Sequence, residues 1–183
     1  RNRAVMTGGI GVPLPGSETW EWDGSTWTGF RTQPSPPALG SYRMVFDEAR
    51  GVLVLAGIGG SPVAFQTWER SGTSWVQRFP AQVPPLSIGS VMCYDSVRAR
   101  TVFYGGNYNL AYLADAWEWD GTNWSRILST TTPEGRTRAY GAFDPSSGRI
   151  LVCGGLRYSS STFSDSWSLG LVQPPSVSSY GNA

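Results

Sequence analysis

One eight-residue motif recurs along the chain and constrains its fold more than any other feature. It reads Trp-Glu-Trp-Asp-Gly-Thr-Asn-Trp at 117–124, with a near-copy at 20–27, a blurred copy at 68–75 and a last trace at Trp167-Ser168. The leading tryptophans fall at 20, 68, 117 and 167, so successive copies are 48, 49 and 50 residues apart. A period of this size is typical of stacked or radial repeat units.

Each copy of the motif predicts a β-hairpin with an aromatic face. Asp-Gly and Ser-Gly favour a two-residue turn, because both central residues of such a turn need φ > 0. Side chains alternate along a strand, so Trp20 and Trp22 share one face while Glu21 takes the other. An indole buries roughly 150–250 Å² and its N–H still needs a partner, so these faces are expected to pack against neighbouring units.

Two further elements recur with the same period. A short apolar strand that ends at a glycine pair precedes each motif, and a strand that ends in aromatic-Asp lies before that one and is followed by a turn with Arg50, Arg98 or Arg149. Each unit is therefore expected to contain four strands. The predicted units span 1–41, which lacks a first strand, 42–89, 90–138, and 139–171, which lacks a fourth strand, followed by a linker or disordered tail at 172–183.

Residues that return with the period are interpreted as structural, because a catalytic group is needed only once. Eleven of the thirteen carboxylates and all nine tryptophans occupy such positions. Turns and bridges are therefore favoured over paired acid-base catalysis, and packing over a sugar-stacking platform. The predicted framework residues are Trp20, Trp68, Trp117, Trp167, Trp27, Trp75, Trp124, Asp47, Asp95, Asp144, Gly8, Gly9, Gly57, Gly105, Gly106, Gly154 and Gly155.

The charge balance and the residue types that are missing narrow the range of functions. The net charge is +1 and Lys is absent, so no nucleic acid partner is implied. His is absent as well, which removes the usual general base and the commonest metal ligand. The apolar runs are too short to span a bilayer. No catalytic residue, metal site or cofactor is predicted.

Cys93 and Cys153 fall in adjacent units at different repeat positions. Two buried thiols are the favoured interpretation, because a free cysteine behaves as a small apolar residue. A disulfide between units in an oxidising compartment is the alternative, and sequence spacing does not settle it. A metal site is disfavoured because the chain offers only two cysteines and no histidine.

The combined pattern resembles a known repeat. Aromatic-Asp, a strand into Gly-Gly and a Trp about twelve residues later, at a period near 49, is similar to the kelch repeat. The Trp-Glu-Trp-Asp-Gly variant is similar to bacterial kelch-like propellers of the galactose-oxidase central-domain type. The resemblance covers 4–169, with Ala56-Gly57 as a departure from the glycine pair. It implies an all-β propeller of four-stranded antiparallel blades, about 3.5–4 of them visible, with the first strand of each lining a central channel.

The two ends do not complete one blade together, since one lacks a first strand and the other a fourth. Two explanations stay open: the segment is part of a longer chain, or two copies associate to close the ring. An open arc would expose the apolar faces of its terminal blades.

Function is expected on the long loops between strands 2 and 3 and between units, which differ from unit to unit. Binding residues concentrate on variable loops held by a rigid frame, although solvated loops without a role would look the same. A non-catalytic scaffold that binds a protein partner, extracellular or on a bacterial cell surface, is the first prediction. A glycan-binding module is one alternative. Another is part of a carbohydrate-active or oxidase-type enzyme, whose catalytic residues, copper-binding histidines included, would lie elsewhere. The candidate binding residues are Phe65, Tyr108, Tyr112, Arg136, Arg138, Arg157 and Tyr158.

Overall fold

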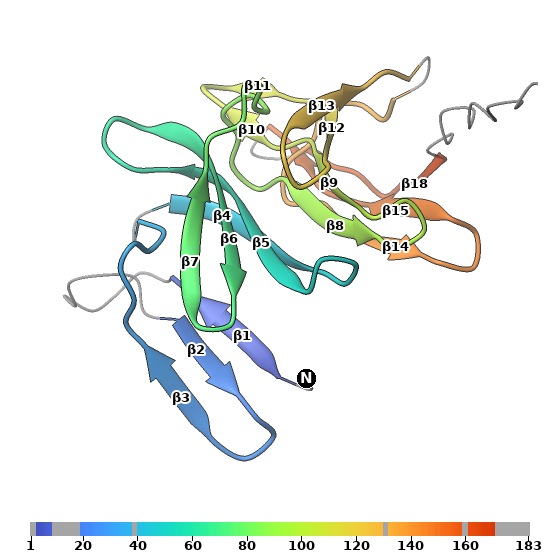
Figure 1. Cartoon of the computed structure of the whole chain (residues 1–183). Helices are drawn as coiled ribbons and strands as arrows, with labels where there is room; N and C mark the ends of the chain where they lie inside the picture. Colours follow the sequence, from blue (N-terminus) through green and yellow to red (C-terminus); the bar gives the residue numbers. More distant parts are fainter. Residues whose placement is uncertain (1–2, 9–18, 38–39, 130–131, 159–160, 171–183) are drawn as a thin grey trace, which may run out of the picture.

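The computed structural model describes residues 3–8, 19–37, 40–129, 132–158 and 161–170, and within them it contains strands and turns but no helix (Figure 1). Eighteen strands form four main antiparallel sheets and two short hairpins. The predicted all-β class is therefore confirmed. Gly9, most of the first long loop and the predicted tail at 172–183 lie outside the described residues.

The strands of each main sheet follow one another along the chain. Sheet 1 contains β1 (Ala4–Thr7), β2 (Thr19–Trp22) and β3 (Trp27–Phe30). Sheet 2 contains β4 (Gly40–Asp47), β5 (Val52–Gly59), β6 (Ala64–Ser71) and β7 (Ser74–Arg78). Sheet 3 contains β8 (Val91–Asp95), β9 (Arg100–Tyr104), β12 (Ala116–Trp119) and β13 (Trp124–Ile127). Sheet 4 contains β14 (Tyr140–Asp144), β15 (Arg149–Cys153) and β18 (Ser166–Gly170).

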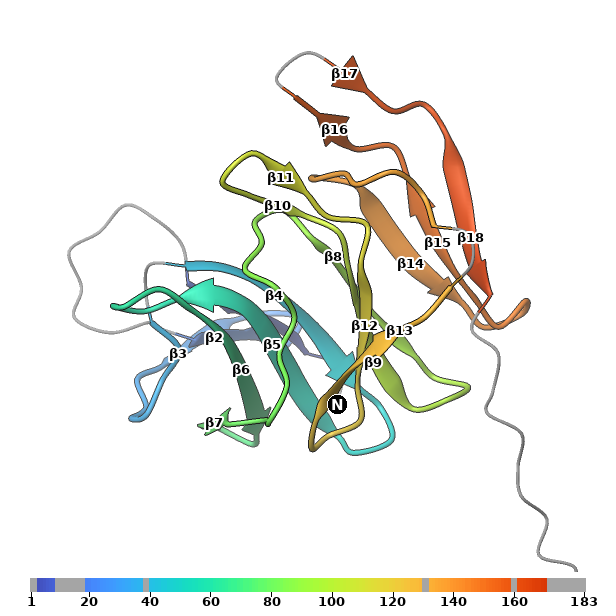
Figure 2. The same cartoon turned by 90° about the horizontal axis from the view of Figure 1, so that it is seen from above.

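Two hairpins project from the loops between second and third strands. The hairpin in sheet 3 pairs β10 (Asn107–Tyr108) with β11 (Ala111–Tyr112), and that in sheet 4 pairs β16 (Leu156–Arg157) with β17 (Ser161–Thr162). Figure 2 shows both hairpins beyond the same end of the sheets. The long loops of two successive units thus meet at one edge of the molecule.

The repeated aspartates organise the short turns at the other edge. Asp23 Oδ1 accepts the backbone N–H groups of Ser25 and Thr26 at 2.8 Å, and Asp120 Oδ1 accepts two in the same way. These bonds stabilise loops at 23–26 and 120–123 that are closed by the pairs Trp22↔Trp27 and Trp119↔Trp124. The tip of each turn lies one residue after the predicted Asp-Gly: the backbone N–H groups of Asp23 and Asp120 donate to the carbonyls of Thr26 and Asn123 at 3.3 Å, which places Gly24-Ser25 and Gly121-Thr122 between them.

Apolar side chains between successive sheets form the core. One cluster joins sheets 2 and 3, a second joins sheets 3 and 4, and a third covers the face of sheet 2 that is turned to sheet 1. In Figure 2 the first strands β4, β8 and β14 lie side by side, and β8 contacts both of the others. Trp75, Trp119 and Trp124 are at most 1% exposed, whereas Trp27 on sheet 1 is 44% exposed. The indoles of Trp75, Trp119 and Trp124 therefore fill the spaces between sheets, whereas Trp167, on the same side of sheet 4 as the buried Val152, stays 38% exposed.

Buried polar contacts accompany this packing. Glu69, 3% exposed, accepts hydrogen bonds from Arg50 at 2.6 Å, Arg78 at 2.8 Å and the indole of Trp119 at 2.9 Å. Arg50 and Arg78 belong to the same sheet as Glu69, and Trp119 belongs to the next sheet. By accepting hydrogen bonds from two guanidinium groups and one indole, the Glu69 carboxylate provides partners for polar groups that are buried between the sheets.

Both cysteines are free thiols. Cys93 is buried between sheets 3 and 4, and burial, assisted by the nearby Asp95, raises the pKa of its thiol to about 12. Cys153 is exposed on the far face of sheet 4. The favoured expectation of two buried thiols is therefore wrong for Cys153, because nothing in the described part of the chain covers that face.

Candidate functional site

The candidate binding residues divide into buried and exposed groups. Phe65 is 9% exposed and its ring meets those of Phe103 and Trp124 edge to face, at 5.3 and 5.9 Å between centroids. Tyr108 is half-buried and packs against the same cluster. Phe65 was expected on a loop, but β6 begins at Ala64 and so carries the ring into the core. It has little surface to offer a partner.

Arg136 holds two loops together. It is 1% exposed and forms a two-pronged ion pair with Asp165, at 2.5 and 3.0 Å. It also donates to the carbonyl of Gly154 at 2.9 Å, and its guanidinium lies 4.0 Å from the ring centroid of Phe163. The hydrogen bond from Arg136, followed by one from Trp167, lowers the pKa of Asp165 to about 2. The donors of Arg136 are thus engaged within the fold.

Tyr112, Arg157, Tyr158 and Glu134 form what we call the loop-edge cluster. The rings of Tyr112 and Tyr158 lie 5.3 Å apart at an angle of 56°, and the Arg157 guanidinium lies 5.5 Å from the Tyr158 ring. Arg157 also pairs with Glu134 at 2.5 Å, and this hydrogen bond is the main cause of its raised pKa. Tyr158 is 58% exposed. The cluster therefore presents aromatic surface beside a charged pair.

The segment that joins sheets 3 and 4 positions this cluster. Thr137 exchanges two backbone hydrogen bonds with Leu156, at 3.0 and 2.8 Å, and the Arg136 N–H donates to the carbonyl of Leu113 at 3.3 Å. The first contact fixes β16 and the second fixes the end of the β10–β11 hairpin. Tyr158 itself has φ of 61°, an uncommon backbone conformation that directs the chain away from β16. Backbone hydrogen bonds from the segment between sheets 3 and 4 thus hold together the two loops that carry Tyr112 and Tyr158.

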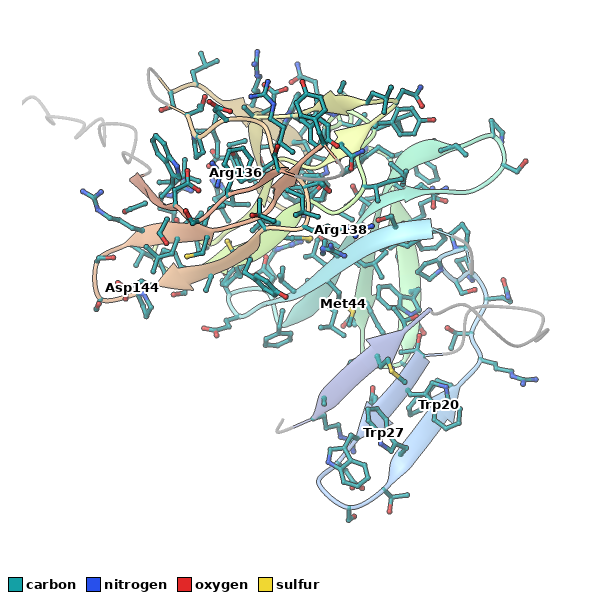
Figure 3. The ribbon with its side chains drawn as sticks, turned by 180° about the vertical axis from the view of Figure 1, so that it is seen from behind. Trp20, Trp27, Met44, Arg136, Arg138 and Asp144 are labelled. Carbon is teal, nitrogen blue, oxygen red and sulfur yellow. The ribbon has the colours of Figure 1, made fainter. Side chains whose placement is uncertain are left out.

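Arg138 lies apart from the loop-edge cluster. It is exposed and lines a hollow of about 360 Å³ between the first strands of sheets 2, 3 and 4. Figure 3 shows Arg138 and Arg136 at separate places in the molecule. Arg43 lines the same hollow and donates to the carbonyl of Ser90 at 2.7 Å. The loop positions do not point to Arg43, because it lies on a first strand, where the other units have Val91 and Tyr140.

A second hollow, of about 700 Å³, opens at the short-turn edge between sheets 1 and 2. Its charged lining includes Arg3, Glu21 and Arg70. Burial raises the pKa of Glu21, but hydrogen bonds from Arg3 and Arg70 outweigh that effect and the net shift is downward. Glu21 is thus a paired carboxylate rather than a free base.

The described residues contain no group of three or more His, Cys, Asp or Glu side chains that could hold a metal ion. In the same part of the chain, no helix has the length and apolar character needed to cross a bilayer.

Comparison with known proteins bears on the fold alone. No protein-family model matches the sequence, and no curated protein matches it. Among solved structures, that of YjhT is similar, with a TM-score of 0.56 and 15% identity over 81% of this chain and 48% of the YjhT chain. The chain thus spans about half the length of the structure that it matches. At this identity the likeness extends to the arrangement of antiparallel sheets.

Proposed function

We propose that this chain forms blades of a kelch-type β-propeller and acts as a non-catalytic scaffold that binds a protein partner through the loop-edge cluster. The repeated sheets, the kelch-like sequence period and the similarity to YjhT support the propeller. An extracellular or bacterial cell-surface location belongs to the same proposal, and the turn-rich, hydroxyl-rich sequence supports it.

One observation carries the binding role: Tyr112, Arg157 and Tyr158, none of them repeat residues, come together from two sheets at the variable-loop edge. Tyr and Arg are enriched among the residues that dominate protein interfaces. The backbone beneath the cluster is held by hydrogen bonds before any partner arrives, so little backbone freedom is lost on binding. The exposed Tyr158 ring supplies apolar area, and Glu134 and Arg157 supply charged groups at its rim.

Selection of binders from a displayed peptide library against the whole chain tests this role. Clones that bind the wild-type chain are expected to lose binding by about 30-fold or more to a Tyr112→Ser/Tyr158→Ser variant, as for hot-spot residues. Phe46→Ser is the matched control, because Phe46 is 52% exposed and lies at the opposite edge, next to Asp47. Clones that bind both variants as well as the wild-type chain would contradict the proposal.

A glycan array and an assay of saccharide turnover distinguish the alternatives. Saturable glycan binding that the tyrosine substitutions abolish would favour a glycan-binding module. Turnover of a saccharide by the purified chain would favour an enzyme.

A further inference from the structure

One contact recurs between successive sheets. Trp75, on the fourth strand of sheet 2, donates its indole N–H to the hydroxyl of Thr19 in sheet 1 at 2.8 Å. Trp124, on the fourth strand of sheet 3, donates to Thr67 in sheet 2 at 2.9 Å. In both cases the acceptor is the residue directly before the leading tryptophan of the preceding sheet.

The contact is missing where its donor is missing. Sheet 4 has no fourth strand within the described residues, and sheet 3, which packs against it, carries Ala116 at the acceptor position. A buried hydroxyl without a partner would cost free energy, so alanine suits that interface. At each interface between described sheets, the indole donor of the fourth strand and the hydroxyl acceptor of the preceding sheet are therefore either both present or both absent.

One donor is left over at the first sheet. Trp27 occupies the same fourth-strand position as Trp75 and Trp124 but is 44% exposed. Its ring lies 5.6 Å from that of Trp22 at an angle of 39°, and the buried pair Trp119 and Trp124 has nearly the same geometry, 5.5 Å and 39°. We call this side of sheet 1, formed by Met6, Trp20, Trp22 and Trp27, the head face; Figure 3 shows Trp20 and Trp27 on it.

One acceptor is left over at the last sheet. Ser166 directly precedes Trp167 and pairs with Cys153 in the sheet, just as Thr67 precedes Trp68 and pairs with Ala56. No described residue bonds the Ser166 side chain. We call this side of sheet 4, formed by Tyr140, Leu151, Cys153, Ser166 and Ser168, the tail face.

The tail face has the register of a buried face but lies open. Leu151 pairs with Ser168 as Val54 pairs with Glu69, yet Leu151 is 40% exposed and Val54 is fully buried. Ser168 also accepts a hydrogen bond from Arg149, at 3.2 Å, as Glu69 does from Arg50. The tail face thus offers hydroxyl acceptors among uncovered apolar side chains, at the positions that a following sheet covers elsewhere in the chain.

We infer that a second copy of this chain docks its head face on the tail face of the first, with Trp27 of one copy donating to Ser166 of the other. Unpaired indole donors lie on the head face and hydroxyl acceptors lie on the tail face, so a head-to-head contact would leave the indoles unsatisfied. Such a head-to-tail contact closes a ring when its rotation permits.

Sedimentation of the wild-type chain over a series of concentrations tests this contact. We expect reversible association, weakened by about 30-fold or more in Trp27→Ala and in Ser166→Trp, because the first removes the anchoring indole and the second fills its site. Leu128→Ser is the control, since Leu128 is 86% exposed outside both faces, and its association should equal that of the wild-type chain. Circular dichroism and thermal unfolding verify that each variant is folded.

Mixing the two variants tests the direction of the contact. Trp27→Ala keeps an intact tail face and Ser166→Trp keeps an intact head face, so their mixture should form a one-to-one pair although neither variant associates alone. The exposed thiol of Cys153 gives a second readout: its alkylation should slow as the wild-type concentration rises and stay constant for Trp27→Ala. A chain that stays monomeric at about 1 mM, association that both variants retain, or a mixture that fails to pair would overturn the inference.

Discussion

The Thr67 hydroxyl, which accepts the indole N–H of Trp124, and the buried hydroxyl of Thr101 allow one substitution, Thr→Val, to be compared at two buried sites. Thr67 and Thr101 are 1% and 0% exposed, but Thr67 accepts the indole N–H whereas the Thr101 hydroxyl has no hydrogen-bond partner among the described residues. Thr→Val replaces the hydroxyl by a methyl group of similar size at each position. At Thr67 it leaves a fully buried indole N–H without a partner, which costs roughly 1–3 kcal/mol.

At Thr101 the same substitution removes an unpaired polar group from the core. Burial of such a hydroxyl costs roughly 1–3 kcal/mol, so Thr101→Val is expected to be neutral or to stabilise the fold by up to about 2 kcal/mol. The two variants should therefore differ by about 2–4 kcal/mol in the free energy of unfolding. Each kcal/mol shifts the Tm by roughly 2–4 °C for a chain of this size.

Urea unfolding measures both variants, and unchanged m-values show that the change lies in stability. A double-mutant cycle of Thr67→Val with Trp124→Phe isolates the contact, with an expected coupling of about 0.5–3 kcal/mol. Equal shifts of Thr67→Val and Thr101→Val in the same direction would refute the reasoning, because burial alone would then account for both. A coupling near zero would remove the hydrogen bond as a cause.

Two further predictions concern the acid stability of one ion pair and the packing of one glycine. The pKa of Asp165 is lowered from 3.8 to about 2, chiefly by Arg136, so its stabilising effect is complete above the unfolded value and is lost as the pH falls from 3.8 to about 2. The stability difference between wild type and Asp165→Asn should therefore be constant above about pH 5 and shrink below pH 4 in acid unfolding; a pH-independent difference would contradict this. Gly57 has φ of 151°, and a Cβ there would lie 2.1 Å from the carbonyl oxygen of Ser41, so Gly57→Ala should destabilise by about 3 kcal/mol or more in the same urea assay. Gly72→Ala, at φ of 59° with open space around it, should cost about 1–2 kcal/mol, and equal losses at the two glycines would rule out the steric cause.

The succession of strands was predictable because it rests on signals local to each unit. Alternation, glycine pairs and the recurring tryptophans mark strands without reference to distant contacts, and the sheets indeed pair strands in chain order. The turns were less predictable, since the tip of each lies one residue after the predicted dipeptide, at Gly24-Ser25 and Gly121-Thr122, where the carboxylates of Asp23 and Asp120 accept backbone N–H groups. The second motif shows the same displacement without a carboxylate: Gly72-Thr73, rather than Ser71-Gly72, form the two-residue turn between the paired residues Ser71 and Ser74.

The candidate site was predictable as a set of residues but not as an arrangement. Tyr112 and Tyr158 were named because they depart from the repeat, yet nothing in their spacing indicates that their rings meet. The two rings meet because of the β10–β11 and β16–β17 hairpins and because of backbone hydrogen bonds from Arg136 and Thr137. None of these features produces a periodic signal in the sequence. Arg43 could have been found by the same test, as a charged residue where the other units carry an apolar or aromatic one.

Because the strands of each main sheet pair in chain order and each sheet packs only against its neighbours, the molecule behaves as a short one-dimensional array. Its stability is then a sum of intrinsic sheet terms and coupling terms between adjacent sheets. Sheets 2 and 3 are flanked on both sides and their strands β5 and β9 are the most deeply buried, so their amides should exchange with solvent most slowly. Opening should begin at sheets 1 and 4 and spread inward, which leaves the middle pair as the last folded unit.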